Sequence, residues 1–278
     1  MKPLQSYGLS DIGIGRSNNE DIWISIPEIG YFAIADGMGG HNAGEVAAKE
    51  AIEHLSESIK KVESQDPVEW IIELRHTIEK ANHHVHHLGK NSGDLNGMGT
   101  TLCCLIWSKN AVIYAHVGDS RIYRLRNKKL QLLTEDHSLY TKWLKYGKSS
   151  EVGSTPYPYK NVITRAVGTT QRANPEISVS IPLPGDLFFL CTDGLSDVLT
   201  LNEMEKILNK SKDLQMASKN LIEKAKNKGS SDNITILIIQ SENESGENLS
   251  RQQCDNKARR ESLAGHAKGI DGPPCQSS

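Results

Sequence analysis

Several strand-length apolar runs in this chain end or begin at an aspartate beside glycine or asparagine, and this pattern limits how the chain can fold. The pairs are Asp36–Gly37, Gly118–Asp119, Asp193–Gly194 and Asp232–Asn233. Short apolar runs bounded by turn residues predict buried strands. One such pair alone is ordinary turn chemistry, but strand ends that share one rim would bring all these carboxylates together. Like charges that close cannot all stay ionised without a cation, so the sequence predicts a divalent-metal site.

The ligand type indicates which metal. Oxygen-only ligands select hard cations such as Mg²⁺ or Mn²⁺, whereas zinc and copper sites recruit histidine and cysteine. Gly37, next to Asp36, would let a backbone carbonyl approach the ion without interference from a side chain. We therefore expect Mn²⁺ or Mg²⁺ as the cofactor.

Strand and helix signals alternate along residues 1–240. Strands are predicted at 22–26, 31–35, 100–107, 111–117, 120–125, 130–133, 177–181, 186–191 and 234–239. Helices are predicted from Asn42 to about Val62, from Asp66 to Gly89, and as a pair between Thr200 and Gly229. Caps with an acid three residues later are predicted at Asn42, Asp66 and Thr200. The strands between 100 and 133 are joined by short polar turns, which predicts an antiparallel meander.

Composition divides the chain into one domain and a tail. Residues 134–170 show weak periodicity, which is typical of a long irregular surface loop. Beyond Gln240 there is no aromatic residue and polar residues dominate, so little can offset the entropy cost of ordering. We predict a folded domain over 1–240 and a disordered polar tail over 241–278.

The charge balance excludes some partners. Lys and Arg number 32 and Asp and Glu 34, giving a net charge of −2, so no global positive field attracts nucleic acid. No apolar run approaches the roughly 20 residues that span a bilayer, and the N-terminus lacks an apolar signal core. We expect a cytoplasmic monomer with no nucleic-acid or membrane partner.

Six sequence blocks occur in the order and spacing of a known enzyme family. They are Asp11–Gly13 with Arg16–Asp21, Ala35–His41, Gly99–Thr101, Val117–Arg121, Thr192–Asp197 and Ser231–Thr235. Together they closely resemble the bacterial form of the metal-dependent protein phosphatases, type 2C, along residues 8–239. The resemblance implies an α+β fold, a four-layer α-β-β-α sandwich of two antiparallel sheets flanked by helix pairs.

The resemblance also implies two core metal ions. Asp36 would bridge them, the Gly37 carbonyl would bind the first ion, and Asp193 and Asp232 would bind the second. Two ions about 3.5–4 Å apart can lower the pKa of a bridging water and stabilise its in-line attack at phosphorus. The chain would thus hydrolyse phosphoserine and phosphothreonine in proteins without a covalent phospho-enzyme.

Further roles follow from the same resemblance. Glu20 would hold a metal-bound water, supported by Asp21, and Arg16 would pair with the substrate phosphate through its bidentate guanidinium. A weaker third metal site would be formed by Asp119, Asp193 and Asp197.

The implied partners are phosphoproteins and an opposing serine/threonine kinase of the Hanks type. Residues 137–170 correspond to the flap beside the active site of bacterial relatives. Its lysines could guide acidic phosphopeptides or belong to a solvated loop. They are Lys142, Lys145, Lys148 and Lys160.

Met38 departs from the pattern of many eukaryotic relatives, which have a histidine there as a proposed general acid. A thioether cannot donate a proton. His41 is near in sequence but could simply lie at the helix entrance, so the general acid is unassigned. The alternative function is a catalytically weak, phosphopeptide-binding pseudophosphatase, which loss of metal-ligating acids would indicate; here every matched acid is present.

Two other signals carry no catalytic prediction. His83 and His87 have the spacing of helical metal ligands, but both point away from Val85 on the apolar seam, so we expect them on the solvent face. Cysteine-based phosphatase chemistry is excluded because neither Cys103–Cys104 nor Cys191 is followed by the arginine of a phosphate loop.

Overall fold

The computed structural model describes residues 4–39, 43–64, 66–108, 110–146, 159 and 161–241. The chain divides into two units, Met1–Ser241 and Glu242–Ser278, and every described residue belongs to the first. The predicted tail lies outside the described residues except for Ser241. The predicted cap at Asn42 lies outside them as well.

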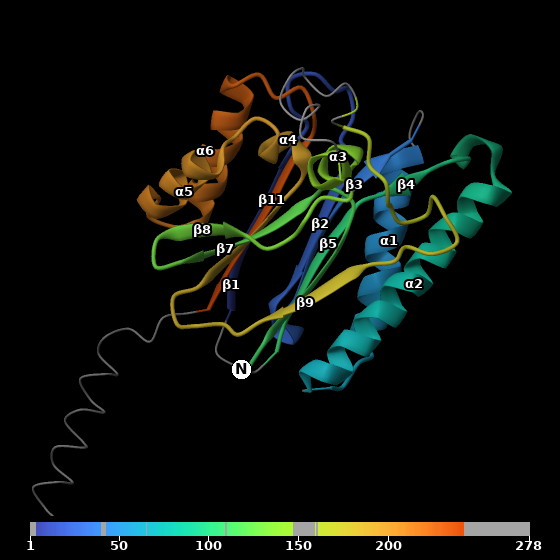
Figure 1. Cartoon of the computed structure of the whole chain (residues 1–278), viewed down its shortest axis with the longest axis horizontal. Coiled ribbons are helices and arrows are strands. Elements are labelled where there is room, and N and C mark those ends of the chain that lie inside the picture. Colours follow the sequence, from blue (N-terminus) through green and yellow to red (C-terminus); the bar gives the residue numbers. More distant parts are fainter. Residues whose placement is uncertain are drawn as a thin grey trace, which may run out of the picture. The chain divides into compact units, whose positions relative to one another are not determined.

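Two antiparallel sheets form the centre of the first unit (Figure 1). One sheet has the order β1 (Leu4–Asp11), β11 (Ile234–Ser241), β10 (Leu187–Cys191), β7 (Arg121–Arg126) and β8 (Lys129–Leu132). The other has the order β2 (Asp21–Ile26), β3 (Tyr31–Met38), β5 (Leu102–Trp107), β6 (Val112–Val117) and β9 (Glu176–Ser180), and the short β4 (Gly99–Thr100) pairs with β3.

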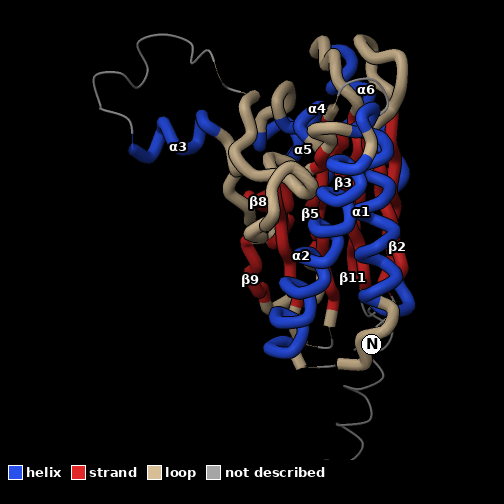
Figure 2. Tube along the Cα trace, turned by 90° about the vertical axis from the view of Figure 1, so that its right-hand side faces the viewer, coloured by secondary structure: helices blue, strands red, loops and turns tan. Residues whose placement is uncertain are grey.

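Helices cover the outer face of each sheet (Figures 1 and 2). The pair α1 (Ala43–Ile59) and α2 (Pro67–Asn91) packs on the sheet that contains β3, and the pair α5 (Leu201–Lys210) and α6 (Leu214–Asn227) packs on the sheet that contains β11. The shorter helices are α3 (Leu139–Tyr146), α4 (Asp193–Ser196), η1 (Pro27–Ile29) and η2 (Gly93–Leu95). The predicted four-layer sandwich is confirmed.

Strand β3 shows how the sequence produces these layers. Tyr31, Ala33 and Ala35 belong to the apolar cluster under α1 and α2. Phe32 and Ile34 belong to the cluster between the two sheets. Because successive side chains of a strand point to opposite faces, a continuous apolar run is buried on both sides.

The predicted meander is wrong at one connection. Strands β6 and β7 do not pair: β6 pairs with β5 and β9, and β7 pairs with β8 and β10 in the other sheet. The chain changes sheets at Gly118, whose φ of +105° suits glycine. Strands buried on both faces have no alternation that marks their partners, so short turns alone suggested hairpin pairing.

The helix caps are partly as predicted. Thr200 and Glu203 form the predicted capping box. The Asp66 side chain caps α2 by accepting a hydrogen bond from the Val68 amide. Its predicted box partner Glu69 instead accepts a hydrogen bond of 2.6 Å from the Ser64 hydroxyl, because Ser64 precedes the helix and competes for that carboxylate.

The short helices η1, η2 and α4 were not predicted, and neither were α3 and β1. The irregular region contains α3, whose amphipathic turns lie within the predicted flap. Strand β1 pairs along its full length with β11 at the edge of a sheet, and its mixed composition gave only a weak strand signal. Within the described part of the chain, no helix combines the length and apolarity needed to cross a bilayer.

Candidate active site

A cavity of about 310 Å³ lies at one end of the sandwich, where loops and strand ends of both sheets meet. It is lined by Arg16, Glu20, Asp36, Gly37, Met38, Gly39, Thr101, Asp119, Asn161, Ile163, Asp193 and Asp232. The structure therefore brings together the four aspartates that follow or precede strands in the sequence. Their predicted role as metal ligands stays a prediction.

Strand β3 places Asp36 at the cavity. Asp36 shares the strand face of Phe32 and Ile34, which is turned toward the other sheet. The next residue must be glycine, because a Cβ on Gly37 would lie 2.1 Å from the Gly44 carbonyl oxygen. A Cβ on Gly44 would in turn lie 2.0 Å from Glu20 Oε2. The start of α1 is thus packed directly against β3 and the Glu20 carboxylate.

The other aspartates come from three separate connections. Asp119 lies in the crossing between β6 and β7, so a turn that changes sheets carries it to the rim. Asp193 is the first residue of α4, directly after β10 and Thr192. Asp232 precedes β11, and its Oδ1 accepts a 2.8 Å hydrogen bond from the Asn233 amide.

Asp21 and Asp197 lie beside this cavity. Asp21 faces Asp36 in the register of β2 and β3, is 6% exposed, and accepts a 2.9 Å hydrogen bond from the Thr192 hydroxyl. Asp197 lines an adjoining cavity of about 220 Å³. Asp193 and Asp232 line both cavities. The third metal site predicted at Asp119, Asp193 and Asp197 stays a prediction.

Crowding of buried acids raises their pKa values. Burial raises the pKa of Asp36 well above its usual range, and the charges of Asp21 and Asp193 add to the effect. Burial raises the pKa of Asp119 to about 7 with a contribution from Asp193. Burial, then Asp232, raises the pKa of Asp193 to about 6. Burial raises the pKa of Asp21 to about 7 despite its hydroxyl donors. Without a cation these groups therefore keep their protons to a higher pH than ordinary aspartates do.

The acids fit a hard divalent cation. Asp21 Oδ1 and Asp193 Oδ1 are buried and form no hydrogen bond, and an unsatisfied buried oxygen costs about 1–3 kcal/mol. Carboxylate oxygens suit Mg²⁺ and Mn²⁺. Among the described residues, the cavity acids do not place three ligand atoms within 4.8 Å of one another. The fit to a divalent cation therefore rests on the two buried, unbonded oxygens and on the oxygen-only set of side chains.

Arg16 is the one cationic side chain among the described residues that line the cavity. Its Nη2 lies 2.8 Å from Asp232 Oδ2, and 49% of its side chain is exposed. Burial lowers the pKa of Arg16, but attraction to Asp232 outweighs this effect and leaves the pKa raised. A charged guanidinium at the mouth of an acidic cavity can grip phosphate oxygens.

Four residues of the cavity had no role predicted from the sequence: Gly39, Thr101, Asn161 and Ile163. Thr101 Oγ1 accepts a 3.0 Å hydrogen bond from the Asp36 amide, and the Thr101 amide donates to the Asp36 carbonyl at 2.8 Å, so Thr101 fixes the backbone at Asp36. Its place in the Gly99–Thr101 block was the available signal. Asn161 and Ile163 enter from the predicted flap, and weak periodicity there gave no signal.

Among the described residues, Lys142 and Lys145 do not line the cavity. His41, Lys148 and Lys160 lie outside the described residues. Lys142 is exposed on α3, and Lys145 forms an ion pair with Glu135.

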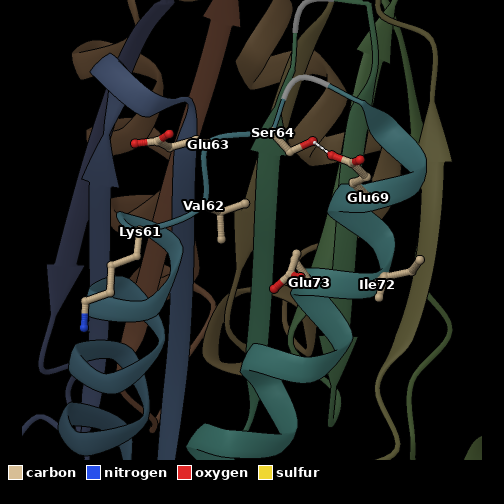
Figure 3. Close-up of a pocket in the computed structure, with 7 residues that line it drawn as sticks. All are labelled: Lys61, Val62, Glu63, Ser64, Glu69, Ile72 and Glu73. Atoms are coloured by element: carbon tan, nitrogen blue, oxygen red, sulfur yellow. Dashed lines mark hydrogen bonds between the residues drawn. The ribbon is translucent and has the colours of Figure 1, made fainter.

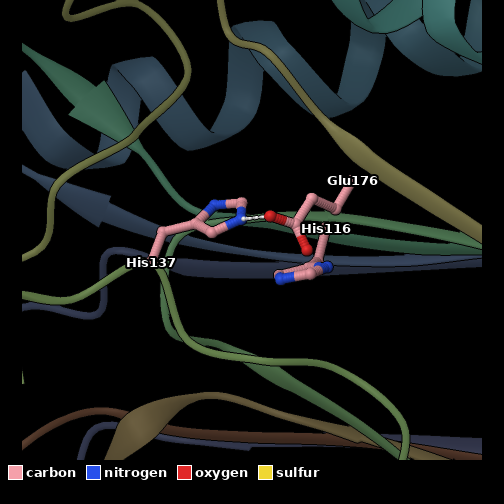
Figure 4. Close-up of side chains that lie close together, drawn as sticks. All are labelled: His116, His137 and Glu176. Atoms are coloured by element: carbon pink, nitrogen blue, oxygen red, sulfur yellow. Dashed lines mark ion pairs between the residues drawn. The ribbon is translucent and has the colours of Figure 1, made fainter. Parts of the chain in front are cut away.

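A second group of metal-ligating side chains lies on β6, β9 and the base of the flap (Figure 4). His116, His137 and Glu176 place ligand atoms within 4.8 Å of one another. Arg165 Nη1 lies 3.0 Å from both His137 Nε2 and Glu176 Oε1, so the chain already supplies a cation here. The Gly118 amide donates to His137 Nδ1 at 3.2 Å, which leaves the proton on Nε2. This group therefore holds the flap base and does not favour a metal.

The other hollows and histidines match structural roles. A hollow of about 500 Å³ between α1 and α2 contains Glu63, Glu69 and Glu73 beside Lys61 and no arginine among its described residues (Figure 3). His83 and His87 are exposed opposite the buried Val85, which confirms their predicted place on the solvent face.

Comparisons with known proteins agree with this site. The family model described as Protein phosphatase 2C matches residues 17–230. A serine/threonine phosphatase stp of Listeria monocytogenes is 37% identical over 235 residues, covering 83% of this chain and 93% of that protein. The structure of the S. agalactiae serine/threonine phosphatase superposes with a TM-score of 0.81 at 33% identity, covering 86% of this chain and 100% of that chain.

A further solved structure contains metal. It is the catalytic domain of the serine/threonine phosphatase PstP in complex with 2 manganese ions, with a TM-score of 0.74 at 30% identity. The superposition covers 85% of this chain and 97% of that chain.

Proposed function

We infer that this protein, which belongs to the protein phosphatase 2C family, is a metal-dependent protein serine/threonine phosphatase, and we propose how its cavity works. The observation that carries the proposal is the convergence of Asp36, Asp119, Asp193 and Asp232 on one cavity with a single guanidinium at its mouth. Asp36 and Gly37 would hold the first of two ions, and Asp36, Asp193 and Asp232 the second. A pseudophosphatase would have lost some of the metal-ligating acids, whereas here all of the predicted acids lie in or beside the cavity.

The chain's own residues bind and orient the substrate. Arg16 would hold the phosphate at the mouth of the cavity, and Glu20, buried against the start of α1, would orient the attacking water with Asp21 behind it. When bound, the divalent ions supply a water of lowered pKa and neutralise charge on the phosphoryl oxygens. The unbonded Asp193 oxygen is a ready ligand for the second ion.

We propose that Mn²⁺ or Mg²⁺ serves in the two core positions and that Asp119, Asp193 and Asp197 form a weaker third site. The shared lining of the two adjoining cavities by Asp193 supports this placement. The leaving group needs a proton donor, and Met38, which lines the cavity, cannot supply it. His41 stays a candidate from the sequence.

The biological setting is also a proposal. Phosphoserine and phosphothreonine proteins would be substrates, an opposing Hanks-type kinase would supply them, and residues 1–240 would act as a cytoplasmic monomer. The family match over 17–230 lies inside that range. The charge of −2 supports the absence of a nucleic-acid partner.

Hydrolysis of p-nitrophenyl phosphate and of a phosphothreonine peptide tests the mechanism. We expect activity with Mn²⁺, loss of activity with EDTA, and loss of activity in Asp193→Ala. Asp213→Ala is the control, because that aspartate caps α6 away from the cavity and its loss affects only stability, by about 1 kcal/mol. Activity that survives chelation or Asp193→Ala contradicts the dinuclear mechanism.

A further inference from the structure

The loop between β1 and β2, residues 12–20, carries two residues of the cavity but contains no helix or strand. Arg16 and Glu20 both line the cavity from this loop. A loop without regular structure needs specific contacts to hold side chains in place. Some residue outside this loop must therefore fix it relative to the aspartates of the cavity.

One buried carboxamide contacts the loop at three points. Asn233 is 5% exposed. Its Nδ2 donates to the carbonyl oxygens of Ile12 and Asn18, both at 2.9 Å. Its Oδ1 accepts from the Glu20 amide, also at 2.9 Å. The contacts lie at the entry and the exit of the loop, on either side of Arg16. Only an amide offers two donors and an acceptor in one plane.

The same residue is tied to the acids. Asn233 follows Asp232, and its backbone amide donates to Asp232 Oδ1 at 2.8 Å. The loop lies directly on this segment, because a Cβ on Gly13 would lie 2.0 Å from the Asp232 carbonyl oxygen. A Cβ on Gly15 would lie 2.5 Å from the Ser231 carbonyl oxygen.

We propose that Asn233 is a positioning residue that fixes Arg16 and Glu20 relative to Asp232. Its side chain holds the loop, and its backbone holds the carboxylate. This inference rests on the proposed function, because it assigns Arg16 to the substrate phosphate. Asn233 itself does not line the cavity, so it acts through the residues that it holds.

The test is a double-mutant cycle with Arg16→Ala and Asn233→Asp, measured as the KM for p-nitrophenyl phosphate with saturating Mn²⁺. Aspartate keeps the shape and the acceptor but removes both donors. We expect Asn233→Asp to raise KM about tenfold, with a smaller change in kcat. The double variant should lie within about twofold of Arg16→Ala alone, because both changes act on the same contact. If the rise in KM of the double variant equals the product of the rises in the two single variants, the proposal is overturned.

Asn209→Asp is the matched control. The Asn209 carboxamide also donates to two carbonyl oxygens, of Lys128 and Glu205, at 2.9 and 2.8 Å, but it lies on α5 away from the cavity. Its KM should equal that of the wild type. If Asn233→Asp does not fold, Gly15→Ala moves the same loop off Ser231 without touching the carboxamide. We then expect a raised KM from Gly15→Ala, and an unchanged KM would overturn the proposal.

Amide hydrogen exchange separates this inference from the proposed function. Exchange over residues 12–20 should be faster in Asn233→Asp than in the wild type and unchanged in Asn209→Asp. Unchanged exchange in Asn233→Asp would overturn the positioning role even in an active enzyme. An inactive wild-type protein with the expected exchange pattern would instead contradict the proposed function.

Discussion

Buried aspartates in two regions of this protein differ in what balances their charge. Asp186 is 1% exposed. Its carboxylate accepts hydrogen bonds from Arg126 Nε at 2.8 Å and from the Leu183 amide at 2.9 Å. In the cavity, Asp193 has a buried oxygen with no hydrogen bond, and its acidic neighbours raise its pKa. The carboxylate of Asp186 is neutralised by a cation from the chain, whereas the carboxylate of Asp193 must bind an external cation or a proton.

The largest expected effect is on catalysis. Asp36→Asn keeps the shape of the side chain but removes the charge between the two proposed ions. We expect kcat for p-nitrophenyl phosphate to fall about 1000-fold, because several kcal/mol of charge stabilisation by metal are lost. Calorimetric titration should show weakened Mn²⁺ binding. Unchanged Mn²⁺ binding would place the ions elsewhere.

At Asp186, whose charge is neutralised by Arg126, we expect an effect on stability and not on catalysis. Asp186→Asn leaves Arg126 without its buried partner and should lower the free energy of unfolding by about 3 kcal/mol. Urea denaturation monitors the loss. In EDTA, Asp36→Asn should instead unfold at a higher urea concentration than the wild type, since the wild-type carboxyl must bind a proton or stay buried as an unpaired charge when the chain folds. Equal destabilisation by both variants would remove the distinction between the two regions.

The pH dependence sharpens the distinction further. Burial and the charge of Asp232 raise the pKa of Asp193 from its usual 3.8 to about 6, so in EDTA the folded state binds this proton more tightly than the unfolded state does. The wild type should therefore lose stability relative to Asp193→Asn as pH rises from 4 to 6, by about 1.4 kcal/mol per pH unit. Above about pH 7, where Asp193 is ionised in both the folded and the unfolded state, the difference should be constant. Urea unfolding in EDTA at each pH measures it, and a difference that does not vary with pH would contradict the raised pKa.

The smallest effect concerns the exposed ion pair at the cavity mouth. Arg16 partly balances Asp232, but both side chains are substantially exposed, and such pairs contribute about 0.2–1 kcal/mol. Arg16→Ala should therefore strengthen Mn²⁺ binding by at most about fivefold while raising KM. Weaker Mn²⁺ binding in this variant would show that Arg16 supports the ions rather than competing with them.

The apolar runs of β3, β10 and β11 predicted these strands well because that pattern is set locally, whereas the layers followed only from the family resemblance. The prediction of strand pairing failed between β6 and β7, because β9 and β10, the strands that pair with them, are distant in the sequence. For the site, acids beside glycine were visible as a repeated pattern. The hydrogen bonds of Asn233 were not, because they join residues more than 200 positions apart. Asn161 and Ile163 were missed for a similar reason, since no local period places the flap over the cavity.

The two-sided burial of β3 also restricts how this chain can diverge. Deleting one residue between Tyr31 and Asp36 would turn the carboxylate to the α1 side of the sheet. Deleting two would keep its facing but withdraw it by about 7 Å along the strand. Exchanges among apolar side chains change neither quantity. Descendants of this sequence can therefore exchange the apolar side chains of β3 for others of similar volume, while the number of residues from Tyr31 to Asp36 is fixed by the position of that carboxylate.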